Sequence, residues 1–311
     1  MWIILAFAVA GAMAQFVDGT LGMGFGVTSA TLLLAFGVSP AAASAATHAA
    51  KIPTTLISGT AHWRHGNVDV KTFVRLAVPG ALMAFIGAVI LVSLSLATAK
   101  AWMAGLLLFF GALIFLRFGF GISLIRPPAR GHTARWLVPI GAVGGFIDAT
   151  GGGGWGPVVT PSLMTVTKHE PRTVVGSVSA SEFVVAVAAS AGFLTGAEKF
   201  EIPWIPVLGL VLGGMMVAPF AARLAGRLPQ APMGAMVGGL ILIVNAVVIV
   251  DAVGGVPPLL GWTLLVSAIV GTGAVSWRVW RREHSEPRAI DEDGRPIDDS
   301  DYPLSAPPMR P

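Results

Sequence analysis

Residues 146–156 read FIDATGGGGWG, and they align without a gap, at an offset of 130 positions, with residues 16–26, which read FVDGTLGMGFG. Both copies hold an aspartate, a threonine and several glycines, and both place an aromatic residue before the last glycine. After a one-residue insertion the match continues as far as Lys51, which aligns with Glu182. The chain is therefore predicted to be an internal duplication, and such repeats are typical of membrane transporters.

The composition excludes several classes of protein. Of 311 residues, 54% are hydrophobic, 12% are charged and none is cysteine. A soluble domain carries about a quarter charged residues, so we do not expect a water-soluble globule. Without cysteine there is no disulfide framework, thiolate metal site or cysteine nucleophile. Residues 1–282 hold 17 basic and 8 acidic side chains, whereas residues 283–311 hold 3 and 8. The apolar body is thus basic and the tail is acidic.

The apolar runs differ in length, and length decides which of them can cross a membrane. A crossing helix needs ~20 residues. The uncharged runs that meet or nearly meet this length are 76–99, 101–116, 203–222, 228–250 and 252–277. Two more long runs, 41–61 and 172–196, each contain one central charge. Four apolar pieces are too short to span and are predicted to be broken or re-entrant helices: 2–17, 23–37, 134–147 and 155–166.

These runs predict an all-α polytopic membrane protein. It has two inverted repeats, each a broken pair of short helices followed by three long transmembrane helices, and one additional C-terminal transmembrane helix. The expected divisions are a first repeat (1–122), a cytoplasmic linker (123–133), a second repeat (134–251), the additional helix (252–282) and a disordered acidic cytoplasmic tail (283–311).

The basic residues predict the orientation in the membrane. If the C-terminus is cytoplasmic, fourteen Lys and Arg residues of the body fall on the cytoplasmic side, and only Lys100 and Lys199 fall outside. Cytoplasmic loops are enriched in Lys and Arg. We therefore expect a multi-pass membrane protein with a cytoplasmic C-terminus.

The duplicated glycines are candidates for a substrate-binding site. Backbone N–H groups at the N-terminus of a helix attract anions, and glycine leaves them uncovered. The alternative is that the glycines only allow helices to pack closely in the bilayer. The candidate glycines are Gly22, Gly24 and Gly26 in the first copy, and Gly151, Gly152, Gly153 and Gly154 in the second.

Two polar pairs recur at the same positions of the repeat. Asp18 and Asp148 can each cap the helix that follows, or move a proton as an anion moves. Thr20 and Thr150 can each cap a helix or donate a hydrogen bond to a bound oxyanion. The sequence leaves both alternatives open for both pairs.

Lys51 and Glu182 are the strongest single-residue signals, because each lies near the middle of a long apolar run. A charge at that depth needs a partner or a cavity. The two side chains can form a structural ion pair, or Lys51 can bind an anionic substrate while Glu182 carries a coupling proton. His48, one turn before Lys51, can titrate near neutral pH or serve in packing. Asn245 is expected to make an interhelical hydrogen bond.

Other chemistry has little support in the sequence. There is no Walker A motif, no His-Glu-x-x-His metal motif and no Gly-x-Ser-x-Gly elbow. We therefore expect no catalytic residues, no metal, no cofactor and no enzymatic activity. The basic loops are interpreted as orientation signals and not as a nucleic-acid surface.

Over about residues 1–250 the chain resembles the TauE/SafE family of sulfite exporters, on the two glycine-rich segments and the long helices that follow them. The resemblance implies a multi-pass secondary transporter of the plasma membrane, of the bacterial inner-membrane type, that exports sulfite, sulfoacetate or related organosulfonates. Its partners would be the lipid bilayer, a small anion and, if transport is coupled, protons. An anion channel of the same architecture is the first alternative, and a non-transporting anchor or sensor that acts through the tail is the second.

Overall fold

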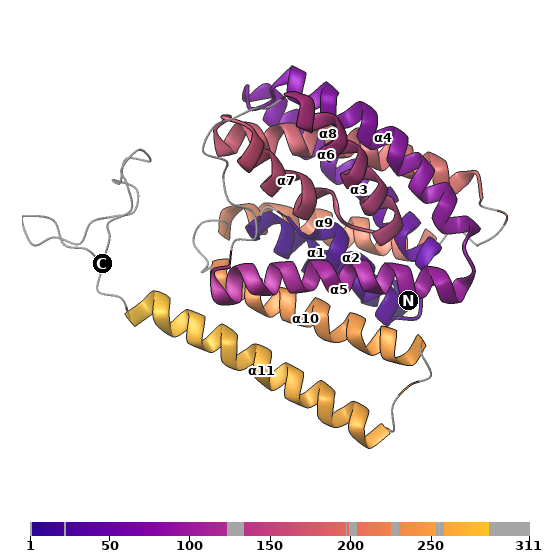
Figure 1. The fold of residues 1–311 in the computed structure, drawn as a ribbon, viewed down its shortest axis with the longest axis vertical. Coiled ribbons are helices and arrows are strands. Elements are labelled where there is room, and N and C mark those ends of the chain that lie inside the picture. The colour runs from indigo at the N-terminus through magenta and orange to yellow at the C-terminus, as the bar shows by residue number, and fades with distance from the viewer. Residues whose placement is uncertain are drawn as a thin grey trace, which may run out of the picture.

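The fold is known from a computed structural model that describes residues 2–21, 23–122, 134–196, 198, 204–224, 230–252, 255 and 258–285. Over these residues the chain is helical and has no strand, which confirms the all-α prediction (Figure 1). The helices of the first half are α1 (Trp2–Leu21), α2 (Phe25–Ala35), α3 (Pro40–Arg64), α4 (Val70–Ser93) and α5 (Leu96–Phe120). Those of the second half are α6 (Ala134–Gly151), α7 (Trp155–Val166), α8 (Pro171–Leu194), α9 (Trp204–Leu224) and α10 (Gln230–Ala252), and α11 (Pro258–Ser285) follows them.

Two helix boundaries differ from the sequence prediction. The uncharged run 76–99 is divided, because α4 ends at Ser93 and the Ser95 side chain caps α5 by accepting a hydrogen bond from the Thr98 N–H at 3.2 Å. Lys100 consequently lies inside α5 and not between two helices. The first short piece, expected over 2–17, continues to Leu21 as a helix of 20 residues. The expected linker 123–133 and the tail from residue 286 onward lie outside the described residues.

Caps and prolines fix where the long helices begin. Asp69 precedes α4, and its Oδ1 accepts a hydrogen bond from the Thr72 N–H at 2.8 Å. His169 Nε2 lies 3.7 Å from the same carboxylate. Partial burial raises the pKa of Asp69, but the Thr72 hydrogen bonds and the His169 ring outweigh it, so the pKa is below its usual value. In both halves the third helix starts with a proline, Pro40 in α3 and Pro171 in α8, which suits the first turn of a helix.

The two halves pack against each other reciprocally. Helix α1 lies along α9, and its counterpart α6 lies along α4, so the first helix of each half contacts the fourth helix of the other. Helix α3 packs on α8, α5 packs on α10, and α11 lies outside α10 (Figure 1). Glycine allows these close crossings: a Cβ on Gly145 of α6 would overlap the Gly80 carbonyl of α4, and a Cβ on Gly213 of α9 would overlap the Ala8 carbonyl of α1.

The reciprocal packing of the two halves produces two apolar cores. One core contains side chains from α1, α2, α5, α9 and α10, with Phe25 and Phe110 among them. The other contains side chains from α4, α6, α7 and α8 around the fully buried Trp155. Helices α3 and α5 contribute side chains to both cores. The breaks between α1 and α2 and between α6 and α7 therefore lie between two packed cores.

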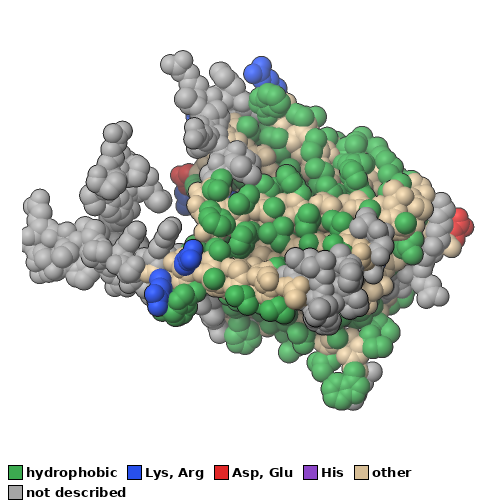
Figure 2. All heavy atoms as spheres, turned by 60° about the horizontal axis from the view of Figure 1, so that its bottom comes forward, with side chains coloured by type: hydrophobic (Ala, Val, Ile, Leu, Met, Phe, Trp, Pro, Cys, Tyr) green, Lys and Arg blue, Asp and Glu red, His purple; other side chains and the backbone are tan. Residues whose placement is uncertain are grey.

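The outer surface is apolar over a larger area than soluble proteins expose to water. Figure 2 shows hydrophobic side chains over most of the described part of the face drawn, with the charged side chains at its margins. Large side chains such as Val78, Leu82 and Met216 are more than half exposed. Within the described residues, four helices are long and apolar enough to cross a membrane: Val70–Ser93, Leu96–Phe120, Pro171–Leu194 and Ala231–Val250. These features are those of a membrane protein.

Candidate functional site

The two helix breaks meet in the interior of the molecule. The first break separates α1 from α2 and includes Gly24, and the second break is Gly152–Gly154 between α6 and α7. A Cβ on Gly26 would lie 2.6 Å from Gly153 Cα and 2.9 Å from Lys51 Nζ. Gly24 at φ 126° and Gly152 at φ 72° also occupy backbone conformations that favour glycine. The glycines thus allow one break to rest directly on the other.

At the N-terminus of each short helix, backbone N–H groups donate hydrogen bonds to a carboxylate of the chain itself. Asp148 Oδ1 accepts hydrogen bonds from the Gly154 N–H at 2.7 Å and the Trp155 N–H at 3.0 Å, at the start of α7. In the first break, Asp18 Oδ1 accepts one hydrogen bond from the Phe25 N–H at 3.2 Å. The N-cap residues themselves are Gly24 and Gly154, so each aspartate binds the start of the short helix from the end of the preceding helix, where the helix dipole favours a carboxylate. Asp148 has the more complete set of contacts.

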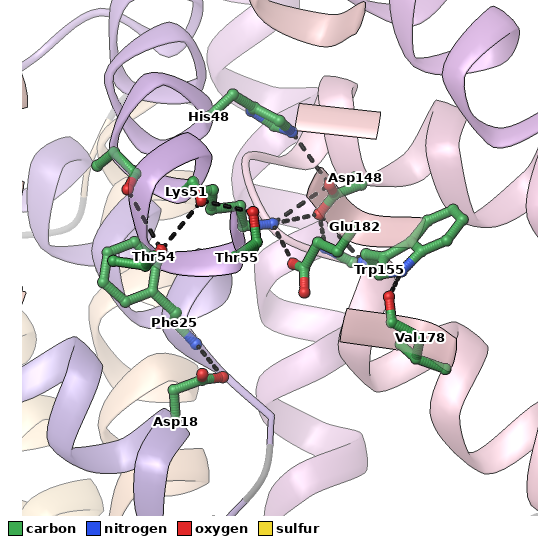
Figure 3. Close-up of polar contacts among 12 residues, drawn as sticks. Asp18, Phe25, His48, Lys51, Thr54, Thr55, Asp148, Trp155, Val178 and Glu182 are labelled. Atoms are coloured by element: carbon green, nitrogen blue, oxygen red, sulfur yellow. Dashed lines mark hydrogen bonds and ion pairs between the residues drawn. The ribbon is translucent and has the colours of Figure 1, made fainter. Parts of the chain in front are cut away.

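Lys51 joins the two halves through its ammonium group. Its Nζ lies 2.9 Å from Asp148 Oδ1, 3.2 Å from Asp148 Oδ2 and 3.0 Å from Glu182 Oε1 (Figure 3). The Lys51 and Asp148 side chains are buried, at 3% and 0% exposed, whereas that of Glu182 is 19% exposed. One buried cation from α3 is thus shared by a carboxylate from α6 and a carboxylate from α8.

His48 completes this cluster from the next turn of α3. Its Nε2 lies 3.1 Å from Asp148 Oδ2, and its Nδ1 lies 2.8 Å from the Ser44 carbonyl oxygen. Both ring nitrogens of His48 are therefore engaged with oxygen atoms of the protein. The Ser44 hydroxyl donates to the Ala149 carbonyl at 2.6 Å. Four side chains therefore form one polar network, in which His48, Lys51 and Asp148 are buried and Glu182 is partly exposed.

A small cavity of about 40 Å³ adjoins the network. That volume has room for a few water molecules or one small ion. Its charged lining consists of Asp18, Lys51 and Glu182. Glycines from both breaks, Gly24, Gly26, Gly153 and Gly154, contribute backbone to its wall, and Thr160 and Ser179 contribute hydroxyl groups.

The remaining candidates from the sequence lie elsewhere or are not described. The Thr150 hydroxyl donates to the Phe146 carbonyl of its own helix at 2.8 Å. Gly151 faces the Leu106 side chain, and Gly152 faces other apolar side chains. Gly22 and the side chain of Thr20 lie outside the described residues. The structure thus gathers only part of the duplicated motif around the cavity.

Two further observations concern polar groups. Asn245 Nδ2 of α10 donates to Thr31 Oγ1 of α2 at 2.9 Å, which is an interhelical hydrogen bond. Among the described residues, no group of three or more His, Asp or Glu side chains is arranged to hold a metal ion.

Sequence reasoning missed two polar residues of the cavity wall. Ser179 aligns with His48 in the repeat, and this correspondence was a usable signal. Thr160 has no such signal, because its first-half counterpart at an offset of 130 is Ala30. Neither residue carries a charge in an apolar run, which is the feature that identified Lys51 and Glu182.

Comparisons with known proteins agree with the helical architecture. The model of the family described as sulfite exporter TauE/SafE matches residues 7–248, which include both breaks. The chain is 43% identical, over 244 residues, to the probable membrane transporter protein YtnM of Bacillus subtilis (strain 168). That alignment covers 78% of this chain and 81% of the relative. No solved structure matches the chain.

Proposed function

The chain belongs to the sulfite exporter TauE/SafE family, and from that premise we propose that it is a secondary transporter that exports small sulfur oxyanions or organosulfonates. The relative YtnM is named as a probable membrane transporter protein, which agrees with this class of function. Sulfite and sulfoacetate are the substrates that we propose first.

One observation carries the proposal: the cavity at the crossing of the two breaks has the Lys51 ammonium group in its wall. Irregular backbone at membrane depth is tolerated only where protein or a water-filled cavity satisfies its polar groups. Broken helices that surround a binding site near the membrane midplane are a recurrent feature of secondary transporters. A small oxyanion matches the size of this cavity and the positive charge of Lys51.

The reciprocal helix packing supports a proposal of two inverted repeats that move by alternating access. Helices α1 and α9, and their counterparts α6 and α4, make equivalent contacts across the molecule. Rocking of one repeat against the other would expose the cavity to each side in turn. Export of an anion is favoured by an inside-negative potential, by about 2.3 kcal/mol per charge per 100 mV.

Inverted repeats in the plasma membrane place equivalent loops on opposite sides, and single cysteines can test this. The native chain has no cysteine. His65, after α3, and Thr195, after α8, are exposed and hold equivalent places in the two halves. We expect His65→Cys to react with a membrane-impermeant maleimide only from the cytoplasmic side and Thr195→Cys only from the opposite side. Reaction of both from one side would contradict the inverted arrangement.

The transport proposal is tested by efflux from proteoliposomes loaded with labelled sulfite, and then with labelled taurine and sulfoacetate. Efflux is measured at several membrane potentials, with and without the unlabelled anion outside. We expect saturable efflux that the outside anion accelerates, because a carrier returns faster when it is loaded. Saturating conductance without such exchange would identify a channel. Absence of flux for all three compounds would contradict the proposed substrate class.

A further inference from the structure

The two carboxylates on Lys51 are held very differently. Asp148 is fully buried and also contacts the N–H groups of Gly154 and Trp155 and the ring of His48. Glu182 is partly exposed and lines the cavity, whereas Asp148 does not line it. For Glu182 the structure shows the one ion pair with Lys51. Asp148 is therefore the fixed partner of the ammonium group, and Glu182 is the partner that can leave.

The charges around the cavity oppose the entry of an anion while Glu182 stays ionised. Of the three charged side chains that line the cavity, Asp18 and Glu182 are acidic and only Lys51 is basic. Like charges brought together at a desolvated site cost several kcal/mol. An anion can therefore reach Lys51 favourably only if the Glu182 carboxylate moves away or takes up a proton.

We propose that Glu182 is an internal competitor that occupies, on Lys51, the place of the transported anion. An anion then binds together with a proton on Glu182, and the empty site closes again when Glu182 returns to Lys51. The inference rests on the proposed function, and it adds the coupling of anion binding to proton uptake. The other titratable or charged groups that face Glu182 or its partner are Asp18 on α1, Lys51 and His48 on α3, and Asp148 on α6.

The test is a binding measurement on the purified full-length protein, which does not depend on transport. Methanesulfonate is the probe, because its charge does not change over neutral pH. Isothermal titration calorimetry at about pH 6 and about pH 8 brackets the neutral range. We expect the wild type to bind at least about tenfold more weakly at the higher pH, since an ionised competitor then holds Lys51. The Glu182→Gln variant should bind tightly at both values.

Glu170→Gln is the matched control. It removes one carboxylate at the start of the same helix, but that side chain is 64% exposed and does not line the cavity. We expect this variant to keep the pH dependence of the wild type.

Proton uptake by the wild type is measured in weak buffer with a pH indicator while methanesulfonate binds. We expect uptake that approaches one proton per anion, and its loss in Glu182→Gln. Uptake that persists in that variant would assign the proton to another group, such as His48, and would overturn the proposal. Binding independent of pH, or no binding to either protein, would also overturn it.

Failure of the proposed function is a separate result. Methanesulfonate binding with the expected pH dependence, but without flux of any anion in proteoliposomes, would retain the internal competitor and contradict transport. Trans-accelerated flux that Glu182→Gln leaves unchanged in rate and pH dependence would retain transport and contradict the internal competitor.

Discussion

Replacing Gly153 with alanine places a methyl group where the two helix breaks touch. A Cβ at this position would overlap the backbone of Gly26 and Val27. Overpacking a well-packed interior costs about 1–3 kcal/mol. The overlapped atoms belong to the backbone and not to the end of a flexible side chain, so they cannot move aside easily. We therefore expect a destabilisation at the upper end of this range, about 3 kcal/mol. At about 2–4 °C per kcal/mol for a chain of this order of size, the melting temperature should fall by about 6–12 °C.

The matched control lies three residues further along the same segment. A Cβ on Gly156 would lie 3.4 Å from Met23 Cβ, close to an ordinary van der Waals separation, so we expect Gly156→Ala to unfold near the wild-type temperature. Thermal unfolding of the detergent-solubilised protein is followed by tryptophan fluorescence, for which the chain offers nine tryptophans. A Gly153→Ala protein that unfolds at the same temperature as the wild type and Gly156→Ala would refute the close contact between the breaks.

Three further substitutions test separate parts of the structure. Lys51→Met leaves the buried Asp148 carboxylate without its cation. It should destabilise the protein by about 3–5 kcal/mol in thermal unfolding and abolish anion efflux; wild-type efflux would contradict a role in binding. Asn245→Leu removes the hydrogen bond to Thr31 and should cost only about 0.5–1 kcal/mol, with efflux retained. Asp69→Ala removes a cap and should cost about 1 kcal/mol at neutral pH. Because the folded-state pKa of Asp69 is lowered, its contribution is present above the usual carboxyl pKa of about 4 and is lost as the pH falls below it. The difference between wild type and Asp69→Ala should therefore shrink in acid, and a difference that grows there would contradict the assignment.

The helical architecture was largely predictable, because a helix that crosses lipid must be apolar and about 20 residues long, and both properties are visible in the sequence. Uncharged runs and a duplicated glycine motif predicted an all-helical chain with a broken helix pair at the start of each half. The boundary between α4 and α5 was missed. The uncharged run continues to Lys100, but α4 ends at Ser93 and the Ser95 side chain caps the start of α5. The packing of α1 on α9 and of α6 on α4 joins segments that are far apart in the chain, and no periodicity reports such contacts.

The sequence identified the charged residues of the candidate site, but it did not show which of them contact one another. Lys51 and Glu182 stood out because isolated charges in apolar runs are costly, and an ion pair between them was one of two alternatives. The structure places them 3.0 Å apart. Asp148 was singled out for the helix break, yet nothing in the sequence linked it to Lys51, which lies 97 positions earlier. The helix N-termini, expected as places for an external anion, hold carboxylates of the chain itself.

The position of a bound anion tests the central claim most directly. Selenite has the pyramidal shape of sulfite, and its selenium can be located by anomalous diffraction from crystals of the wild type and of Glu182→Gln grown with the anion. We predict one strong peak in the cavity between the two breaks, within hydrogen-bonding distance of Lys51 Nζ, and higher occupancy in Glu182→Gln. A peak elsewhere in the molecule, with an empty cavity in both proteins, would contradict the assignment of this cavity as the anion site.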